Sequence, residues 1–372
     1  MPRRTPPRSA EAVVDLAAIA TNTKIVRSRT SAALMAVVKA DAFGHGMVPV
    51  ARAALDGGAT WLGVVWPGEA MVLRSAGVTA PVLAWLYPPA AELRPAIAAG
   101  VDLAASTFEQ LAGIAAATTG DRRARVHLKV DTGLARSGAA ASDWPALVAA
   151  ARRYERAGRI EVVAVWSHLA DADADDPVLV AAQVARLAAA VDVATAAGLR
   201  PQLRHLANSA GALHHADTHL DLVRVGIALY GCEPVPQRPV GLHPAMTLRA
   251  PVVSVKRVAA GTGVSYRHEY VTRTATRLAL VPVGYADGIP RAAAGAAQVW
   301  TGTERRPVAG VIAMDQLVVD IGPAGPDPSE VVLFGPGVDG EPTVAEWAAW
   351  ADTIPHELLC RVGARVERRH VG

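Results

Sequence analysis

The sequence predicts a (β/α)8 barrel followed by a mostly antiparallel β domain, and three observations lead to this fold class. Before residue 226, eight short β-rich runs alternate with longer segments of helical period, which is typical of parallel strand pairing. After Pro244 the runs are separated by Gly/Pro turns and little helix intervenes. The least common polar residues fall where the barrel strands are expected to end, and barrels place their sites there. We therefore predict a barrel over 1–240, with residues 1–10 as a disordered tail, and a β domain over 241–372.

Each expected barrel strand is a short apolar run bounded by turn residues. A short apolar segment at 11–16 and a helical segment at 21–29 come first, and the expected strands are then 33–38, 60–65, 81–85, 101–104, 125–130, 160–166, 202–206 and 222–225. Helices are expected in the gaps, at 48–56, 68–76, 90–98, 107–117, 142–156, 177–197 and 209–214. Eight is the strand count of a closed barrel. The alternative is a doubly wound open sheet, but Gly44-His45-Gly46 is a weak match to a dinucleotide-binding loop.

The C-terminal third has the pattern of an antiparallel domain. Strands are expected at 247–258, 277–283, 298–300, 307–321 and 330–334. A helix is expected at 343–352, where Thr343 and Glu346 have the spacing of a capping box.

Composition limits the class of protein. The 372 residues are 51% hydrophobic and 19% charged, so a large core is expected and general disorder is not. The net charge is +3 and no basic block carries interleaved aromatics, so nucleic acid is not an expected partner. We find no signal peptide and no apolar stretch that we expect to span a membrane. Two cysteines without metal spacing fit a reducing compartment, and we expect a cytoplasmic protein that holds no metal.

Lys39 ends the first expected barrel strand, and this is the most informative position of the chain. Of the 37 basic residues only four are lysines, Lys24, Lys39, Lys129 and Lys256, so lysine is kept here in a chain that otherwise uses arginine. A lysine at the mouth of a buried strand is partly desolvated, which lowers its pKa and makes its amine a nucleophile for a carbonyl group. The simpler interpretation is a solvated lysine at a strand end.

Other polar residues follow the later strands. Arg136 comes after the fifth expected strand, His168 ends the sixth, Asn208 and Ser209 follow the seventh, and Arg224, Gly226 and Ile227 end the eighth. The loops after the last two strands, with a helix N-terminus, are the usual phosphate site of barrels. An amine opposite a phosphate site suggests a phosphorylated aldehyde held covalently, and pyridoxal phosphate (PLP) is the cofactor with that chemistry.

Each of these residues also has a structural explanation when taken alone. His168 could be a core histidine, Arg224 could pair with Asp221, and Ser209 could cap a helix. The four aspartates between 171 and 176 could bind a metal, but acids in a loop before a helix are usually solvated. Their joint placement at one end of the barrel favours function.

At this point the sequence resembles the alanine racemases. The matching motifs occur in family order at 38–46, 129–138, 205–210, 221–231, 264–266, 284–288, 314–316 and 353–357, and the match extends from about residue 11 to 366. The resemblance implies a homodimer of a barrel plus a β domain, in which the partner's β domain completes each site. It implies L-alanine and D-alanine as substrates and PLP as cofactor, in a cytoplasmic enzyme that supplies D-alanine for cell-wall peptidoglycan.

The resemblance also implies roles for single residues. Lys39 would hold PLP covalently and act as one base, and Tyr266 would be the second base. Arg224 would face the pyridine nitrogen, supported by His168, and Arg136 would bind the substrate carboxylate. The remaining implied residues are Trp85, Phe43, Asn208, Ser209, Gly226, Ile227 and His356 for the cofactor, Met314, Asp315 and Tyr285 for the substrate, and Lys129 as a support that the family often carboxylates.

Three positions depart from the family pattern. Phe43 stands where a tyrosine usually contacts the cofactor phosphate, and His356 stands where another tyrosine is usual. Arg267 replaces a glycine after Tyr266. Other interpretations therefore stay open: a racemase of broader substrate range, a barrel-fold PLP decarboxylase, or a PLP carrier without activity.

Overall fold

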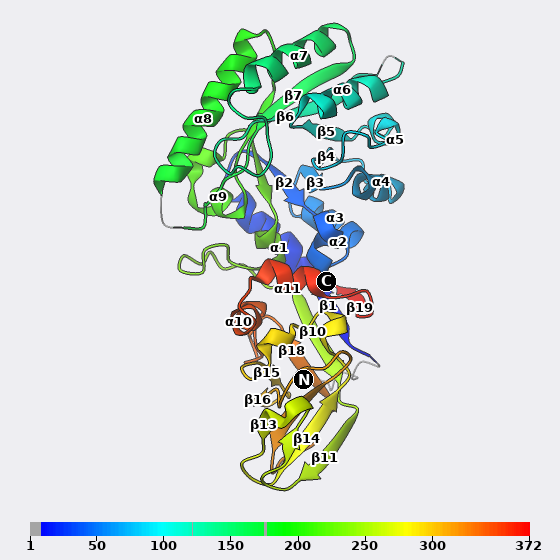
Figure 1. Ribbon diagram of the computed structural model, residues 1–372, viewed down its shortest axis with the longest axis vertical. Helices are drawn as coiled ribbons and strands as arrows, with labels where there is room; N and C mark the ends of the chain where they lie inside the picture. The colour runs from blue at the N-terminus through cyan, green and yellow to red at the C-terminus, as the bar shows by residue number, and fades with distance from the viewer. Residues whose placement is uncertain (1–8, 121, 175–176) are drawn as a thin grey trace. The chain divides into compact units, whose positions relative to one another are not determined.

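The computed structural model describes residues 9–120, 122–174 and 177–372, and their contacts form two compact units (Figure 1). One unit comprises 19–42 and 47–242, and the other comprises 9–18, 43–46 and 243–372. The sequence predicted a single division at residue 240. The contacts instead group 9–18 with the C-terminal unit, because β1 (Glu11–Asp15) is a strand of its sheet. Residues 1–8 of the predicted tail lie outside the described residues.

The first unit is an eight-stranded parallel sheet that nearly closes into a barrel, which confirms the predicted fold class. The sheet order is β8-β7-β6-β5-β4-β3-β2-β9, with strands β2 (Ala33–Val37), β3 (Trp61–Val64), β4 (Val82–Ala84), β5 (Asp102–Ala105), β6 (Ala124–Lys129), β7 (Ile160–Trp166), β8 (Leu203–His205) and β9 (Leu222–Val225). Most of their side chains are buried, as expected of parallel strands covered on both faces.

The seam between β8 and β9 is joined by both backbone and side chains. The Asp221 N–H donates to the Arg204 carbonyl, and the Arg224 N–H donates to the Ala207 carbonyl, each at 3.1 Å. The Arg204 guanidinium also donates to the Asp221 carboxylate, from Nε at 2.8 Å and from Nη2 at 3.2 Å. The two strands at the ends of the sheet order, β8 and β9, are therefore held in register with each other.

Helices cover the outside of this barrel. They are α1 (Leu16–Arg27), α3 (Met47–Asp56), α4 (Pro67–Ser75), α5 (Arg94–Ala98), α6 (Phe108–Ala117), α7 (Trp144–Arg156), α8 (Pro177–Ala196) and α9 (Ser209–His214). Figure 1 shows α7 and α8 beside β7, and the Trp144 indole donates to the Ala190 carbonyl at 2.9 Å between these two helices.

The helix α8 corrects one sequence expectation. By length and apolar composition alone it could cross a membrane, although we expected no such stretch. One such helix is weak evidence for a membrane span. The buried residues of α8, Val180, Gln183, Leu187, Ala190 and Ala194, recur at helical spacing, as in a helix that packs one face on a barrel.

The second unit is built on three sheets. A six-stranded sheet has the order β16-β15-β18-β10-β1-β19, a three-stranded sheet is β11-β14-β17, and β12 pairs with β13. The strands are β10 (Met246–Pro251), β11 (Ser254–Val258), β12 (Gly263–Val264), β13 (Tyr270–Val271), β14 (Thr276–Val281), β15 (Gln298–Trp300), β16 (Arg305–Pro307), β17 (Leu317–Gly322), β18 (Glu330–Phe334) and β19 (Glu367–Val371). Nearly all pairs are antiparallel, and β1 with β19 is the parallel exception.

Two expected strands of this unit are each divided. The segment 247–258 forms β10 and β11, which belong to different sheets, and 307–321 contains only the end of β16 and most of β17. The sequence analysis also missed α11 (Pro355–Arg361) and β19, whereas α10 (Val344–Trp350) begins at the expected Thr343 cap. Apolar runs do not reveal where a chain crosses from one sheet to the next.

The short element α2 (Lys39–Gly44) is a left-handed turn. Ala40, Asp41, Ala42 and Phe43 have φ between 50° and 55°, and Gly44 has φ 79°. For residues other than glycine this region costs roughly 1–2 kcal/mol per residue. Gly44 is needed for a second reason, because a Cβ there would lie 2.4 Å from the Leu359 carbonyl oxygen. The strain is concentrated directly after Lys39.

We predict that Ala40→Gly raises the thermal unfolding temperature. Ala40 is exposed with φ 53°, and glycine adopts this region without the Cβ penalty, for a net gain of up to about 1 kcal/mol after its greater loss of entropy. The matched control is Ala189→Gly, at an exposed site inside the right-handed α8, which should cost about 1 kcal/mol. Equal losses in both variants would show that the left-handed turn does not persist in solution.

Candidate functional site

Lys39 follows β2 on a backbone that is held on both sides. The Val38 N–H donates to the Gly63 carbonyl at 2.9 Å, and the Ala40 N–H donates to Glu69 Oε1 at 2.8 Å. The side chain of Lys39 is half-buried. The amine therefore stands at the C-terminal end of a fixed strand, which is the place that barrel enzymes use for chemistry.

Arg224 of β9 is a buried cation that binds the ends of three strands together. Its guanidinium donates to His205 Nδ1 at 2.9 Å, His168 Nδ1 at 3.0 Å, and the carbonyls of Ser167 at 2.9 Å and Leu206 at 3.1 Å. The residue is 5% exposed, and burial lowers the pKa of Arg224 to about 9. All of these acceptors are neutral groups, so the guanidinium is oriented by hydrogen bonds and has no neighbouring carboxylate among the described residues.

His168 is held as a neutral imidazole. Burial, followed in order of effect by the cations Arg224, Arg136, Lys129 and Lys39, lowers the pKa of His168 to about 2. Because Nδ1 accepts from Arg224, the single ring proton is on Nε2. His168 thus presents an N–H donor from the end of β7.

Gln183 holds the loop that carries His168, and the sequence analysis did not find it. This fully buried amide of α8 accepts from the Ala170 N–H at 2.9 Å and donates to the His168 carbonyl and to Thr132 Oγ1, each at 3.0 Å. Thr132 Oγ1 lies 2.8 Å from Ser167 Oγ. A glutamine in an expected surface helix carries no sequence signal for this role.

Lys129 ends β6 as a buried amine among other cations. Its Nζ donates to Ser137 Oγ and lies 4.6 Å from the centroid of the Trp166 ring. Burial, with smaller contributions from Arg224 and Arg136, lowers the pKa of Lys129 to about 8. At neutral pH a larger fraction of this amine is therefore neutral than of an ordinary lysine.

The loop that bears Arg136 folds back onto the end of β6. The Asp131 N–H donates to the Ala139 carbonyl, and the Ala139 N–H donates to the Lys129 carbonyl, each at 2.9 Å. Gly138 is required inside this loop, because a Cβ there would lie 2.7 Å from the Asp131 nitrogen. Arg136 is thereby carried next to Lys129 with its guanidinium exposed.

Ser209 and the backbone after β9 form a compact hydrogen-bonded cluster. Ser209 Oγ accepts from the Gly226 N–H at 3.1 Å and the Ala228 N–H at 3.4 Å, and Ile227 begins the 3-10 turn η2 (Ile227–Tyr230). Asn208 caps α9 by accepting from the Gly211 N–H at 2.9 Å. The predicted phosphate-site residues are therefore brought together.

Trp85 follows β4 and packs with the interior layer of the barrel. This layer contains Met35, Leu83 and Trp166, and the Trp85 and Trp166 rings lie 6.4 Å apart. Trp85 is only partly buried, which leaves part of its ring accessible at the strand ends.

Tyr266, in the second unit, is exposed on a strained loop. Its side chain is 67% exposed, and Ser265 and Arg267 on either side have φ of 60° and 62°. Ser265 Oγ donates to the Val311 carbonyl at 2.7 Å, which anchors the loop. Arg267 thus occupies a left-handed conformation that the family's usual glycine adopts without cost.

Tyr285, Met314 and Asp315 lie together in the second unit. The Tyr285 N–H donates to the Ala313 carbonyl at 3.1 Å, and the Ala286 N–H donates to the Met314 carbonyl at 2.9 Å. Asp315 pairs with Arg365 at 2.7 Å. Tyr285 and Met314 are 43% and 53% exposed, so with Tyr266 they form a set of large exposed side chains.

Phe43 and His356, two of the three positions that depart from the family pattern, contact each other. Their ring centroids are 5.9 Å apart and tilted by 47°. Phe43 is buried and His356 is exposed. The two substitutions therefore alter one shared surface within the second unit.

Four basic side chains and one neutral N–H donor lie at the strand ends of the barrel unit. The basic residues are Lys39, Lys129, Arg136 and Arg224, and the donor is His168. Such an arrangement favours ligands that carry phosphate and carboxylate groups. Among residues 9–120, 122–174 and 177–372, no group of His, Cys, Asp and Glu side chains could hold a metal ion. Asp175 and Asp176 lie outside the described residues.

Comparison with known proteins identifies the same family in both halves of the chain. The model of the alanine racemase N-terminal domain matches residues 14–234, and that of the C-terminal domain matches 245–370. The alanine racemase of Frankia casuarinae is 54% identical over 97% of this chain and 96% of its own length, and that of Thermobifida fusca is 51% identical over 98% of both.

Solved structures agree with these sequence matches. The alanine racemase of D-cycloserine-producing Streptomyces lavendulae superposes with a TM-score of 0.95 at 44% identity, covering 99% of this chain and 98% of that one. The alanine racemase of Streptomyces coelicolor superposes with a TM-score of 0.94 at 46% identity and 98% coverage of both chains.

We predict that one lysine titrates near pH 8 and that this lysine is Lys129. The chain has four lysines, so the side-chain carbon resonances of labelled lysine can be followed individually by NMR, and Lys129→Gln identifies the signal. Because the unfolded chain holds this proton more tightly, the free energy of unfolding should rise with pH between about 8 and 10.5 more in the wild type than in Lys129→Gln. Four lysines that all titrate near the ordinary value of about 10.4 would contradict the assignment.

Proposed function

Because the chain belongs to the alanine racemase family, we propose that it interconverts L-alanine and D-alanine with pyridoxal phosphate. The observation that carries this proposal is the amine of Lys39 at a barrel strand end, among cations and beside the oriented pair of Arg224 and His168. When bound, PLP conjugates with the amino group of an amino acid and makes its Cα proton acidic.

The residues of the barrel unit fit this cofactor. Lys39 supplies the amine that binds the aldehyde, and Ser209 with the backbone after β9 supplies hydroxyl and N–H groups suited to phosphate. Arg224 supplies an N–H donor for the ring nitrogen. A guanidinium does not release its proton readily, so it leaves that nitrogen unprotonated, which limits stabilisation of charge on the ring and disfavours side reactions.

Racemisation requires that a proton be removed from one face of Cα and returned to the other. We assign these two tasks to Lys39 and Tyr266. Tyr266 is 67% exposed in a single chain, with Tyr285 and Met314 also exposed. Large exposed side chains of this kind mark interaction surfaces, which supports a homodimer in which the partner supplies the tyrosine.

Arg136 is the proposed ligand of the substrate carboxylate. A guanidinium binds a carboxylate through two parallel hydrogen bonds, provided that its orientation is fixed. Lys129, whose pKa is lowered to about 8, offers a neutral amine that can take up CO2. The resulting carbamate would be an anion beside Arg136 and would hold the guanidinium in place. Met314 and Asp315 are the proposed contacts from the second unit.

We also propose that the enzyme acts in the cytoplasm and supplies D-alanine for cell-wall peptidoglycan. This proposal rests on membership of the family, in which that role is the usual one.

We predict that the purified protein with PLP removes the optical rotation of L-alanine and that Lys39→Arg does not. Borohydride reduction followed by peptide mapping should place the pyridoxyl group on Lys39. Racemisation of a wide panel of amino acids would indicate a broader racemase, release of CO2 would indicate a decarboxylase, and bound PLP without either reaction would indicate a carrier. Label on another lysine would refute the assignment of Lys39.

We predict that Tyr266→Phe nearly abolishes racemisation but keeps some exchange of the Cα proton of D-alanine, because Lys39 remains. Proton NMR in D2O, followed from each pure enantiomer, measures this exchange. Exchange that persists from L-alanine instead would reverse the assignment of the two faces.

A mixing experiment tests whether sites are shared between subunits. Inactive Lys39→Arg and inactive Tyr266→Phe, refolded or exchanged together, should regain about a quarter of the wild-type activity, since half of the dimers are mixed and one of their two sites is intact. No recovery in verified mixed dimers would place both residues in the same subunit.

We predict that Phe43→Tyr retains PLP more strongly than the wild type. The added hydroxyl can donate a hydrogen bond to phosphate, with an effect on the order of 1.5–3 kcal/mol at most. The measurement is the rate of PLP loss on dilution, with His356→Phe as a control for changes in the neighbouring ring. Unchanged or faster loss in Phe43→Tyr would show that the hydroxyl has no partner here.

A further inference from the structure

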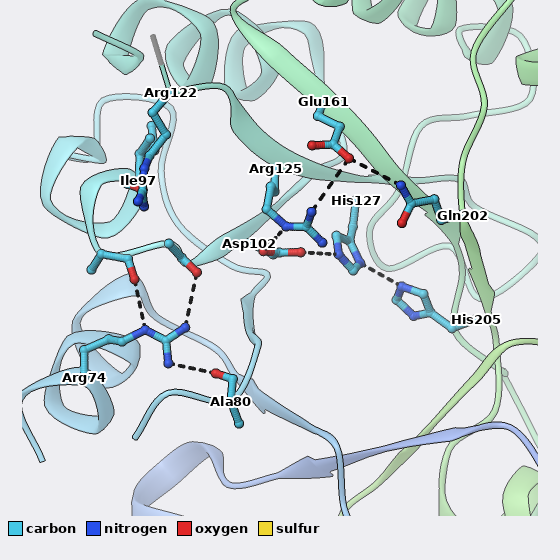
Figure 2. A network of polar contacts seen from close by, with 12 residues as sticks. Arg74, Ala80, Ile97, Asp102, Arg122, Arg125, His127, Glu161, Gln202 and His205 are labelled. Carbon is cyan, nitrogen blue, oxygen red and sulfur yellow. Dashed lines mark hydrogen bonds and ion pairs between the residues drawn. The ribbon is translucent and has the colours of Figure 1, made fainter. Parts of the chain in front are cut away.

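A chain of buried hydrogen bonds runs from Arg224 through the barrel interior to the opposite end of the strands. Arg224 Nη1 lies 2.9 Å from His205 Nδ1, His205 Nε2 lies 3.0 Å from His127 Nδ1, and His127 Nε2 lies 3.0 Å from Asp102 Oδ2. Figure 2 shows the last three residues in line. All four residues are at most 5% exposed. Asp102 is the first residue of β5, whereas His205 is the last residue of β8.

The direction of this chain follows from its first member. A guanidinium can only donate, so His205 Nδ1 must accept and must be unprotonated. Burial lowers the pKa of His205 well below its ordinary value, so the ring is neutral and its single proton is on Nε2. That proton points at His127 Nδ1, which must therefore be bare, and the His127 proton on Nε2 is donated to Asp102. Every donor in the chain faces towards the carboxylate.

Both imidazoles are also fixed in place by aromatic neighbours. The Trp166 ring stacks on His205 with centroids 5.1 Å apart and an angle of 16°, and Trp61 meets His127 edge-on at 5.7 Å. Both rings are fully buried, so a rotation that exchanged their nitrogens would have to break these contacts. Only the position of the protons can vary, and the group at the end of the chain decides that position.

We propose that Asp102 is a positioning residue for the reaction, which acts through His127 and His205 on the orientation of Arg224. With a carboxylate at the end, only one arrangement of protons satisfies every donor. Without it, His127 can carry its proton on Nδ1, which then opposes the Nε2 proton of His205 and in turn forces a proton against Arg224. Asp102 thus keeps Nδ1 of His205 a hydrogen-bond acceptor, and the Arg224 guanidinium therefore keeps its orientation.

Asp102 is itself held at this end of the barrel. Arg125 Nε donates to Asp102 Oδ1 at 2.9 Å, and Arg125 Nη1 lies 3.7 Å from Glu161 Oε1 (Figure 2). Glu161 therefore shares the partner of Asp102 without touching the histidines. Glu161 offers a matched control. Glu161→Gln removes an equal charge from the same cluster but leaves the hydrogen bonds from Arg224 to Asp102 intact.

The first test reads the protons directly. In protein labelled with 15N-histidine, the imidazole nitrogens of His127 and His205 should both show the neutral form with the proton on Nε2, and single substitutions of each histidine assign the signals. In Asp102→Asn, His205 should lose this single form, and in Glu161→Gln it should keep it. A proton on Nδ1 of either ring in the wild type, or no change in Asp102→Asn, would overturn the proposal. The wild-type result can overturn it even where Asp102→Asn does not fold.

The second test is kinetic and rests on the proposed function. Asp102→Asn should lower kcat for racemisation about ten- to hundredfold with little change in KM, as expected when a catalytic group is displaced slightly. Glu161→Gln should stay within about twofold of the wild type, since surface charge changes rarely cost more than a few tenths of a kcal/mol. Equal losses of kcat in the two variants at matched unfolding temperature would mean that Asp102 only stabilises the barrel.

The two tests separate the proposals. If the wild type does not racemise alanine, the proposed function fails. The 15N spectra still decide whether His127 and His205 both carry their protons on Nε2 as inferred. If racemisation occurs but Asp102→Asn leaves kcat unchanged, only the positioning role fails.

Discussion

The placement of Arg224 is the constraint on which the polar cluster at the barrel strand ends depends. A guanidinium inside a barrel is expensive unless each of its donors is satisfied. Here the acceptors are two imidazole nitrogens and two carbonyls from the ends of β7 and β8, at 2.9 to 3.1 Å. Those strand ends must therefore keep their register across the β8–β9 seam, which is why the seam is closed by backbone bonds and by the pair of Arg204 and Asp221.

The positive field at the strand ends lowers the pKa values of nearby groups and favours anionic ligands. Four cations lower the pKa of His168, and each of them lies on a different strand, turn or loop. Because like charges held together raise the free energy of the fold, the arrangement is stabilised by any anion that binds among them. Burial and, after it, the same field lower the pKa of Lys129 to about 8, so this cation can become neutral without moving. A ligand with a phosphate and a carboxylate complements this site.

Backbone strain is concentrated beside the residues that are assigned chemical roles. The left-handed turn follows Lys39 directly, and Tyr266 stands between Ser265 and Arg267, both with positive φ. Strain of this kind persists where the surrounding structure holds it, as Glu69 does at Ala40 and Val311 does at Ser265. Each proposed base is therefore presented by a backbone segment that a relaxed loop would not form.

The sequence by itself determined the order of the strands and helices, and with it the barrel, because burial on both faces imposes an apolar run on every parallel strand. It also determined that Lys39, His168, Ser209 and Arg224 fall at strand ends, since that follows from where each run stops. Only the tertiary structure decided that β1 joins the C-terminal sheet, that 247–258 divides between two sheets, and that Gln183, His127 and Asp102 join hydrogen-bond networks that lead to His168 and Arg224. These features depend on contacts between residues that are distant in the chain, and a buried polar side chain leaves no periodic pattern by which its partner could be predicted.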